Sequence, residues 1–144
     1  MTPPIFHLVY VSRAAEDISY TDVQDILKVS RQHNVIAGIS GMLIFREDYF
    51  LQLLEGSEAE VKSVLGKIMM DDRNHSLRVL IEAEGPEPLC KGWSMAFLDG
   101  DISSNETREL VEFFDTCIKP GANNRNLILP LLRKFRESAP SISL

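Results

Sequence analysis

The sequence predicts an α+β fold of the ferredoxin-like type, a βαββαβ unit with an additional fifth strand, two helices on one sheet face and two C-terminal helices. Short apolar runs rich in β-branched and aromatic residues alternate with stretches of helical periodicity in that order. A serine cap precedes both helical stretches of the unit. The 144 residues, 44% of them hydrophobic, suffice for one domain with a substantial core.

Three strands and one helix are predicted in the first 56 residues. The alternating segment 5–12 (IFHLVYVS) predicts a strand. Apolar residues at helical spacing predict a helix over 20–34, after the cap Ser19. The apolar runs 38–45 and 49–56 flank a short turn, which is typical of a β-hairpin.

The second half of the unit adds one helix and two strands. Ser57 begins a Ser-x-x-Glu capping pattern, which predicts a helix over 58–70 with an apolar stripe. The polar segment 71–76 predicts a loop. A fourth strand is predicted over 77–85, and a fifth over 93–100 (WSMAFLDG).

The character of the sequence changes after residue 100. A capping pattern at Ser103 predicts a helix over about 105–117, and a Pro/Gly/Asn cluster then predicts a break. Residues 126–137 predict a last helix. We therefore divide the chain into a unit over 1–100 and a helical extension of the same domain over 101–144.

The composition argues against several classes of function. The formal net charge is −6 and no basic cluster occurs, so we expect neither nucleic acid nor a membrane as partner. No apolar run could cross a bilayer, the N-terminus lacks signal-peptide features, and Cys90 and Cys117 make no disulfide framework, so we expect a cytoplasmic protein. The three histidines, His7, His33 and His75, lack metal-ligand spacing, so we expect no metal site.

Two polar residues interrupt strands that should otherwise be apolar. Tyr10 lies in the first predicted strand and Gln52 in the third, and these strands are neighbours in a ferredoxin-like sheet. The Tyr10 hydroxyl could therefore donate to the Gln52 amide oxygen on the helix-covered face, while the amide NH2 still needs an acceptor. Either the two side chains form a purely structural hydrogen-bonded pair, or the Gln52 amide also bonds to a ligand between helix and sheet.

Polar residues on the two predicted helices allow the same two interpretations. Four residues fall near one edge of the first helix: Ile26, Ser30, His33 and Asn34. Asn34 ends that predicted helix, and a C-terminal cap is its structural alternative. On the second helix Lys67 and Asp71 stand four residues apart and so face the same way, with a solvated ion pair as the structural alternative.

Six segments share the order and spacing of one known family. They are LVYVS with Tyr10, RQHN with Asn34, GISGMLIF, FLQLLEG with Gln52, DDRNH from Asp71 to His75, and GWSM with Trp93 and Met95. Together they resemble the BLUF domain, a blue-light sensor that uses flavin, over about residues 5–98. No single segment is diagnostic, whereas their order and spacing are specific.

The resemblance implies that a flavin ring lies between the two helices, against the sheet. It implies that Tyr10 donates an electron and a proton to the excited flavin. Gln52 would bridge the Tyr10 hydroxyl and the N5/O4 edge of the ring, and Asn34 would hydrogen-bond the C4 carbonyl and N3–H edge. FAD is the flavin that the resemblance implies, with FMN or riboflavin as alternatives.

The remaining roles also come from the resemblance. Lys67 would lie at the O2 side, where relatives often carry arginine, and Ile26 would pack on the ring. The ring edge or ribityl chain would be lined by Ser30, His33 and Asp71. Trp93 and Met95, both placed on the predicted fifth strand, would read out the change in Gln52, and which of the two faces the flavin stays open.

The expected output is a signal to another molecule, without enzymatic turnover. The 144 residues leave no room for an effector domain, so we expect a homo-oligomer and a separate effector protein as partners. The C-terminal helices offer apolar faces for this contact, formed by Leu110, Phe113, Phe114, Leu127, Leu131, Leu132 and Phe135. Two alternatives are a ferredoxin-like module that binds another small ligand or a protein without photochemistry, and a flavin enzyme that acts on a substrate.

Overall fold

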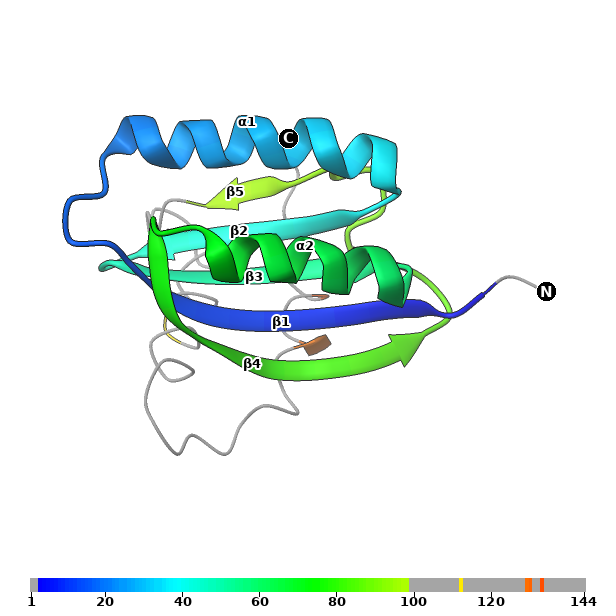
Figure 1. The fold of residues 1–144 in the computed structure, drawn as a ribbon. Helices are drawn as coiled ribbons and strands as arrows, with labels where there is room; N and C mark the ends of the chain where they lie inside the picture. The colour runs from blue at the N-terminus through cyan, green and yellow to red at the C-terminus, as the bar shows by residue number, and fades with distance from the viewer. Residues whose placement is uncertain (1–2, 99–111, 113–128, 131–132, 134–144) are drawn as a thin grey trace.

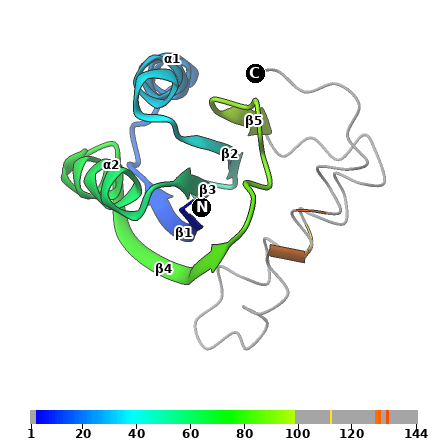
Figure 2. The ribbon, with the colours of Figure 1, turned by 90° about the vertical axis from the view of Figure 1, so that its right-hand side faces the viewer.

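A computed structural model of the chain describes residues 3–98 and, further on, positions 112, 129, 130 and 133 (Figure 1). One sheet has the strand order β4-β1-β3-β2-β5. Its strands are β1 (Ile5–Ala14), β2 (Ser40–Arg46), β3 (Tyr49–Gly56), β4 (Asn74–Gly85) and β5 (Ala96–Leu98). Helices α1 (Tyr20–Ala37) and α2 (Glu58–Met70) lie side by side over one face (Figure 2). The ferredoxin-like prediction with an added fifth strand is confirmed.

The strand register places the two interrupting polar residues opposite each other. β3 pairs antiparallel with β1, and Tyr10 lies directly across from Gln52. β2 pairs antiparallel with β3 and parallel with β5, and Leu43 of β2 is the other neighbour of Gln52. Because directly paired residues point to the same face, Tyr10 and Gln52 share one side of the sheet.

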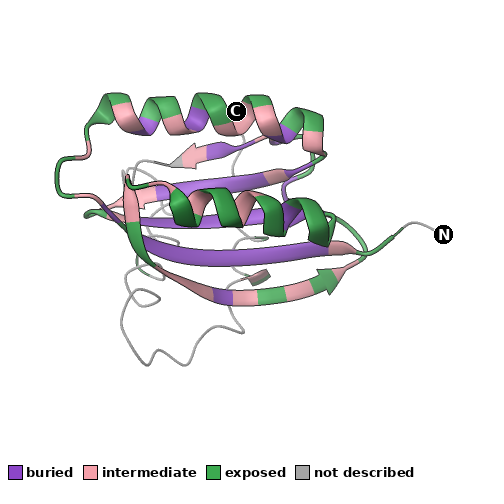
Figure 3. Ribbon diagram, viewed as in Figure 1, coloured by how far each residue is buried: buried purple, intermediate pink, exposed green. Residues whose placement is uncertain are grey.

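The sheet is buried on both faces. The helix-covered face carries a cluster that includes Leu8, Leu27 and Leu54, and the opposite face carries one that includes Val9 and Leu53. The central strands β1 and β3 are therefore buried along nearly their whole length (Figure 3). Strands of this kind read as continuous apolar runs, so a polar side chain within them needs a partner inside the protein.

Both helices begin where the sequence predicts. Ser19 caps α1, and its hydroxyl accepts from the Asp22 N–H while the Asp22 carboxylate accepts from the Ser19 N–H, which completes the capping box. The Ser57 hydroxyl accepts from the Glu60 N–H at the start of α2. These short-range signals fix the helix starts because they depend on residues three positions apart.

The end of α1 differs from the prediction. The helix continues past Asn34 to Ala37 and ends at Gly38, which has a φ of 71°. This left-handed conformation favours glycine, and the N–H groups of Gly38 and Ile39 bond to the Asn34 carbonyl. The side chain of Asn34 is therefore free of the capping role and serves elsewhere.

The fourth and fifth strands also differ from their predicted bounds. β4 begins at Asn74, inside the predicted loop, because Asn74 pairs with Ala14 at the end of the long strand β1. β5 is shorter than predicted, and Trp93 and Met95 precede it. The backbone carbonyls of residues 93–95 bond to Gly41 N–H and to side chains of α1, so they do not join the strand ladder.

The predicted C-terminal helices lie outside the described residues apart from the four isolated positions, and so do the seven apolar residues proposed for their faces. Of the described positions, Leu129 packs against the cluster on the sheet face opposite the helices. Within the part of the chain that the structure describes, no helix combines the length and hydropathy needed to span a bilayer.

Gly41 in β2 should tolerate no side chain. A Cβ atom built there would lie 2.1 Å from the Leu53 carbonyl oxygen and 3.1 Å from the Met95 methyl. We expect Gly41→Ala to lower the free energy of unfolding by roughly 3 kcal/mol, because the backbone of β3 must move. Urea denaturation measures this change.

Gly66→Ala is the matched control. Gly66 is exposed within α2 and a Cβ there would meet nothing within 4 Å. Alanine should stabilise the helix by about 0.5–1 kcal/mol. A Gly41→Ala protein as stable as the wild type would contradict the close approach of β2 and β3.

Candidate functional site

A pocket lies between α1, α2 and the sheet. It consists of two adjoining hollows with about 380 and 580 Å³ of empty space, including space open to solvent. Six residues line both hollows: Ile26, Ser30, Gln52, Ile68, Asp71 and Arg73.

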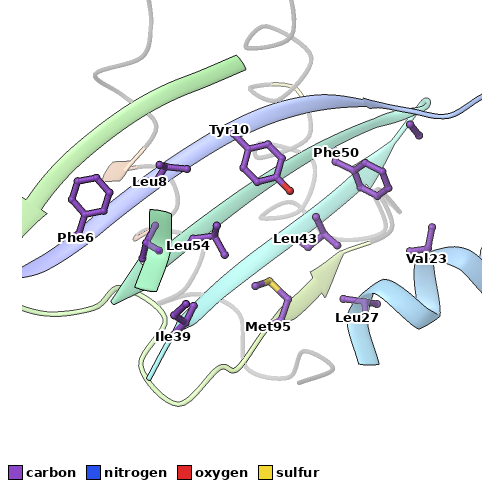
Figure 4. Packing of buried hydrophobic residues seen from close by; sticks show 12 residues of the cluster. Phe6, Leu8, Tyr10, Val23, Leu27, Ile39, Leu43, Phe50, Leu54 and Met95 are labelled. Carbon is purple, nitrogen blue, oxygen red and sulfur yellow. The ribbon is translucent and has the colours of Figure 1, made fainter. Parts of the chain in front are cut away.

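The hydroxyl of Tyr10 points into this region from β1. Tyr10 is buried and donates a hydrogen bond to Oε1 of Gln52. Figure 4 shows the hydroxyl directed across the sheet, toward the side where Leu43 and Met95 lie. Burial, and secondarily the negative charge of Asp71, raises the pKa of Tyr10 far above its ordinary value. Tyr10 is therefore a neutral hydrogen-bond donor at physiological pH.

The Gln52 amide connects Tyr10 to Met95. While Oε1 accepts from Tyr10, Nε2 donates to the Met95 sulfur at 3.4 Å. A thioether is a weak acceptor, and an amide nitrogen carries two hydrogens, so one strong donor position remains for a partner in the pocket. The buried amide is thus only partly satisfied by the protein itself.

Met95 and Trp93 lie on opposite faces of the sheet. Met95 is fully buried in the helix-side cluster, with its sulfur at Gln52. Trp93 is buried in the cluster on the other face. In this structure Met95 is therefore the neighbour of Gln52.

Asn34 contributes a buried amide to the pocket from α1. It is 2% exposed and lines the larger hollow. Its Nδ2 donates to the Ser94 carbonyl at 2.7 Å, which leaves Oδ1 and the second Nδ2 hydrogen for a ligand. Asn34 thus ties α1 to the segment before β5.

The larger hollow also contains an unsatisfied nitrogen. Nε2 of His33 is buried and has no hydrogen-bond partner within the described residues. The Lys67 side chain lines the same hollow from α2. An orphaned buried polar atom beside a cation and an amide fits a ligand with hydrogen-bonding atoms along its edge.

Arg73 is a site residue that the sequence analysis did not single out. Its Nη2 lies 2.7 Å from Oδ2 of Asp71, and its Nη1 lies 3.0 Å from Oδ2 of Asp25 on α1. Hydrogen bonds from Arg73 hold the pKa of Asp71 below its ordinary value and raise that of Arg73. Asp71 therefore pairs with Arg73, and no ion pair with Lys67 occurs among the described residues.

Ile26 was predicted as an apolar contact and lines both hollows, whereas three other apolar wall residues were not predicted. Leu43 and Phe50 line the smaller hollow from the sheet, and Ile68 lines both hollows from α2. Alternation along the strands could have found Phe50, which shares the face of Gln52. The contact of Arg73 with Asp25 had no comparable signal because it depends on how α1 and α2 pack.

The comparisons with known proteins agree on one family. Residues 5–96 match the model described as BLUF, sensors of blue-light using FAD. The chain is 28% identical over 74 residues to the blue light- and temperature-regulated antirepressor BluF of Escherichia coli, covering 51% of this chain and 18% of that protein. It is 34% identical over 67 residues to the photoactivated adenylate cyclase subunit alpha of Euglena gracilis, covering 46% of this chain and 7% of that protein. The chain thus spans less than a fifth of these curated relatives.

Solved structures share the fold. BlsA in its photo-activated state has a TM-score of 0.81 at 23% identity, covering 97% of this chain and 99% of that chain. The dark-state structure of the BLUF protein BlrB has a TM-score of 0.76 at 21% identity, covering 92% and 94%. A bacterial light-regulated adenylyl cyclase has a TM-score of 0.72 at 26% identity, covering 78% and 34%.

The buried Tyr10 phenol predicts a loss of stability in alkali. The unfolded phenol ionises near pH 10, whereas the folded protein keeps the proton because burial and Asp71 raise the pKa. Above that pH the unfolded state binds fewer protons, so this group lowers the free energy of unfolding by up to about 1.4 kcal/mol per pH unit.

Urea denaturation of wild-type and Tyr10→Phe proteins between roughly pH 8 and 11 measures this effect. The stability of the wild type relative to Tyr10→Phe should decline as the pH rises, since phenylalanine has no proton to lose. Parallel stability curves would contradict the raised pKa.

Proposed function

The chain belongs to the BLUF family of sensors of blue light using FAD, and from this premise we propose that it is a blue-light photoreceptor. We place a non-covalently bound flavin in the pocket between α1, α2 and the sheet. The observation that carries the proposal is the buried pair of Tyr10 and Gln52, which lines this pocket and leaves an amide donor unsatisfied.

The residues of the pocket fit a flavin ring. Such a ring has two apolar faces and a polar edge. Ile26, Leu43 and Phe50 offer apolar contacts, while Asn34 and Gln52 offer donors and acceptors. The unpartnered His33 Nε2 fits the same polar edge or the ribityl chain. Ser30, Lys67 and Asp71 complete the set predicted from the sequence, and each lines the larger hollow.

A bound flavin supplies a strong oxidant when it absorbs blue light. Tyr10 is placed to give up an electron, and its hydroxyl proton has a direct route to Oε1 of Gln52. Because its pKa is raised, Tyr10 holds that proton until light is absorbed. Asp71 adds negative charge near the phenol, which favours loss of an electron from Tyr10.

Gln52 is suited to retain a light-induced change in its hydrogen bonds. Its two amide ends have similar shapes and opposite hydrogen-bonding character, so rotation or tautomerisation reverses the pattern with little change in volume. In the arrangement described here Nε2 faces the Met95 sulfur. A reversed amide would present a different group to Met95 and to the pocket, and we assign the lit-state signal to this reversal.

The polar contacts that we assign lie at the ring, so they do not select the rest of the cofactor. FAD is our first choice because the family description names it. FMN and riboflavin carry the same ring and are alternatives that extraction from the purified protein distinguishes.

We infer that the output passes from Met95 through the segment before β5 to the opposite face of the sheet. Trp93 belongs to that segment and is part of the cluster on that face, against which Leu129 also packs. The relatives named as an antirepressor and as cyclase subunits are longer than the matched region. For this chain we propose a sensor role, with a separate effector protein or a homo-oligomer as the receiving partner.

The photoreceptor proposal predicts a reversible change in colour. Blue light should shift the visible flavin absorption of the purified protein to longer wavelength, and the shift should disappear in darkness. Tyr10→Phe and Gln52→Leu should each retain flavin and lose the shift, because each removes one member of the hydrogen-bonded pair.

Tyr49→Phe is the matched control. Tyr49 lies in β3 like Gln52, but it packs toward the opposite face, where Arg13 sits over its ring. Its photocycle should be normal. A normal shift in Tyr10→Phe or Gln52→Leu would refute the assigned roles, and a colourless protein that flavin cannot reconstitute would favour a binding module without photochemistry.

A further inference from the structure

A buried carboxylate lies on the sheet face opposite the pocket. Glu55 follows Gln52 by three positions along β3, so the two side chains point to opposite faces. Glu55 is fully buried within the protein. A buried carboxylate is costly unless hydrogen-bond donors surround it, so its partners indicate what it holds in place.

Four groups satisfy the Glu55 carboxylate. Oε2 lies 2.9 Å from Nδ1 of His7 and 2.8 Å from the Leu89 amide nitrogen. Oε1 lies 3.0 Å from the Ser40 hydroxyl and 2.5 Å from the Cys90 amide nitrogen. His7 and Ser40 belong to β1 and β2, whereas Leu89 and Cys90 belong to the link from β4 to β5. Each carboxylate oxygen therefore joins this link to a neighbouring strand.

Residues 86–95, which we call the connector, include no strand or α-helix. Hydrogen bonds to residues other than Glu55 also hold the connector. The Trp93 N–H donates to the Cys90 carbonyl at 2.9 Å, and the Gly41 N–H donates to the Trp93 carbonyl at 3.0 Å. The Asn34 side chain then binds the Ser94 carbonyl.

The connector ends at Met95, which contacts the hydrogen-bonded pair of Tyr10 and Gln52. Nε of Arg31 donates to the Met95 carbonyl at 3.0 Å, and the Met95 sulfur accepts from Gln52. The connector thus runs from a carboxylate on one face of β3 to an amide on the other face of the same strand. Its start is fixed by the bonds from the Leu89 and Cys90 amides to Glu55.

We propose that Glu55 is a positioning residue for the photocycle. It anchors the start of the connector, so that Met95 lies against Gln52 and the Ser94 carbonyl lies against Asn34. This inference rests on the proposed function for its light-dependent part. The anchor favours the present arrangement of Met95, and weakening it should slow the return to that arrangement after illumination.

Glu55→Gln tests the anchor with little change in shape. Each carboxylate oxygen accepts one connector amide, so either orientation of the new amide places NH2 against the N–H of Leu89 or Cys90. Ser40→Ala is the matched control, because it removes a bond to the same carboxylate and leaves both connector amides bonded.

The first readout does not depend on the flavin photocycle. Trp93 is the single tryptophan of the chain and lies in the connector, so its fluorescence reports the connector directly. In Glu55→Gln we expect emission at longer wavelength and stronger quenching by acrylamide than in Ser40→Ala. Equal emission and quenching in the two variants would overturn the anchor.

The second readout is the dark recovery of the flavin spectrum. Glu55→Gln should recover more slowly on the order of tenfold, the effect of losing one hydrogen bond to a charged group, while Ser40→Ala stays within about twofold of the wild type. Unchanged or faster recovery in Glu55→Gln would overturn the positioning role.

A third measurement covers the case in which Glu55→Gln does not fold. In the wild-type protein, the Leu89 and Cys90 amides should resist hydrogen exchange as strongly as the amides of β3, although the connector has no strand ladder. Rapid exchange there would overturn the anchor. Absence of any light-induced shift in the wild type would instead refute the proposed function. The fluorescence and exchange results would still show whether Glu55 anchors the connector.

Discussion

A hydrogen-bonded pair of polar side chains lies at the centre of an otherwise apolar sheet. Tyr10 and Gln52 face each other across β1 and β3, where both strands are buried. A polar group in such a place destabilises the protein unless it is paired, so each residue requires the other. The Gln52 NH2 group donates only to a thioether sulfur, which is a weak acceptor. It can therefore also donate a hydrogen bond to a ligand in the pocket.

The two faces of the sheet have different tasks, and β3 connects them. Its helix-side residues hold the amide that we place against the flavin, and its opposite face holds the anchored connector. A strand is stiff along its length, because ladders with β1 and β2 fix it on both sides. We therefore infer that a local change at Gln52 is transmitted more easily through the connector, which lacks a strand ladder, than through the sheet itself.

The pocket depends on how the helices are spaced. Arg73 links the end of α2 to Asp25 on α1, so the two helices are joined at one end of the pocket. Asn34 joins α1 to the segment before β5. These contacts hold the walls while leaving Asn34, His33 and Gln52 with capacity for further hydrogen bonds. Sites in which the scaffold is fixed and the inner polar atoms are incompletely paired are suited to binding a polar-edged ring.

The sequence by itself determined the order of elements and the pairing of Tyr10 with Gln52, because apolar periodicity, caps and turn residues are local, and a ferredoxin-like order makes the first and third strands neighbours. Tertiary structure decided the rest. The extension of α1 to Ala37 depends on Gly38, and the displacement of Met95 from β5 depends on bonds to distant residues. The contact of Arg73 with Asp25 and the four partners of Glu55 likewise join segments far apart in the chain, which no local pattern encodes.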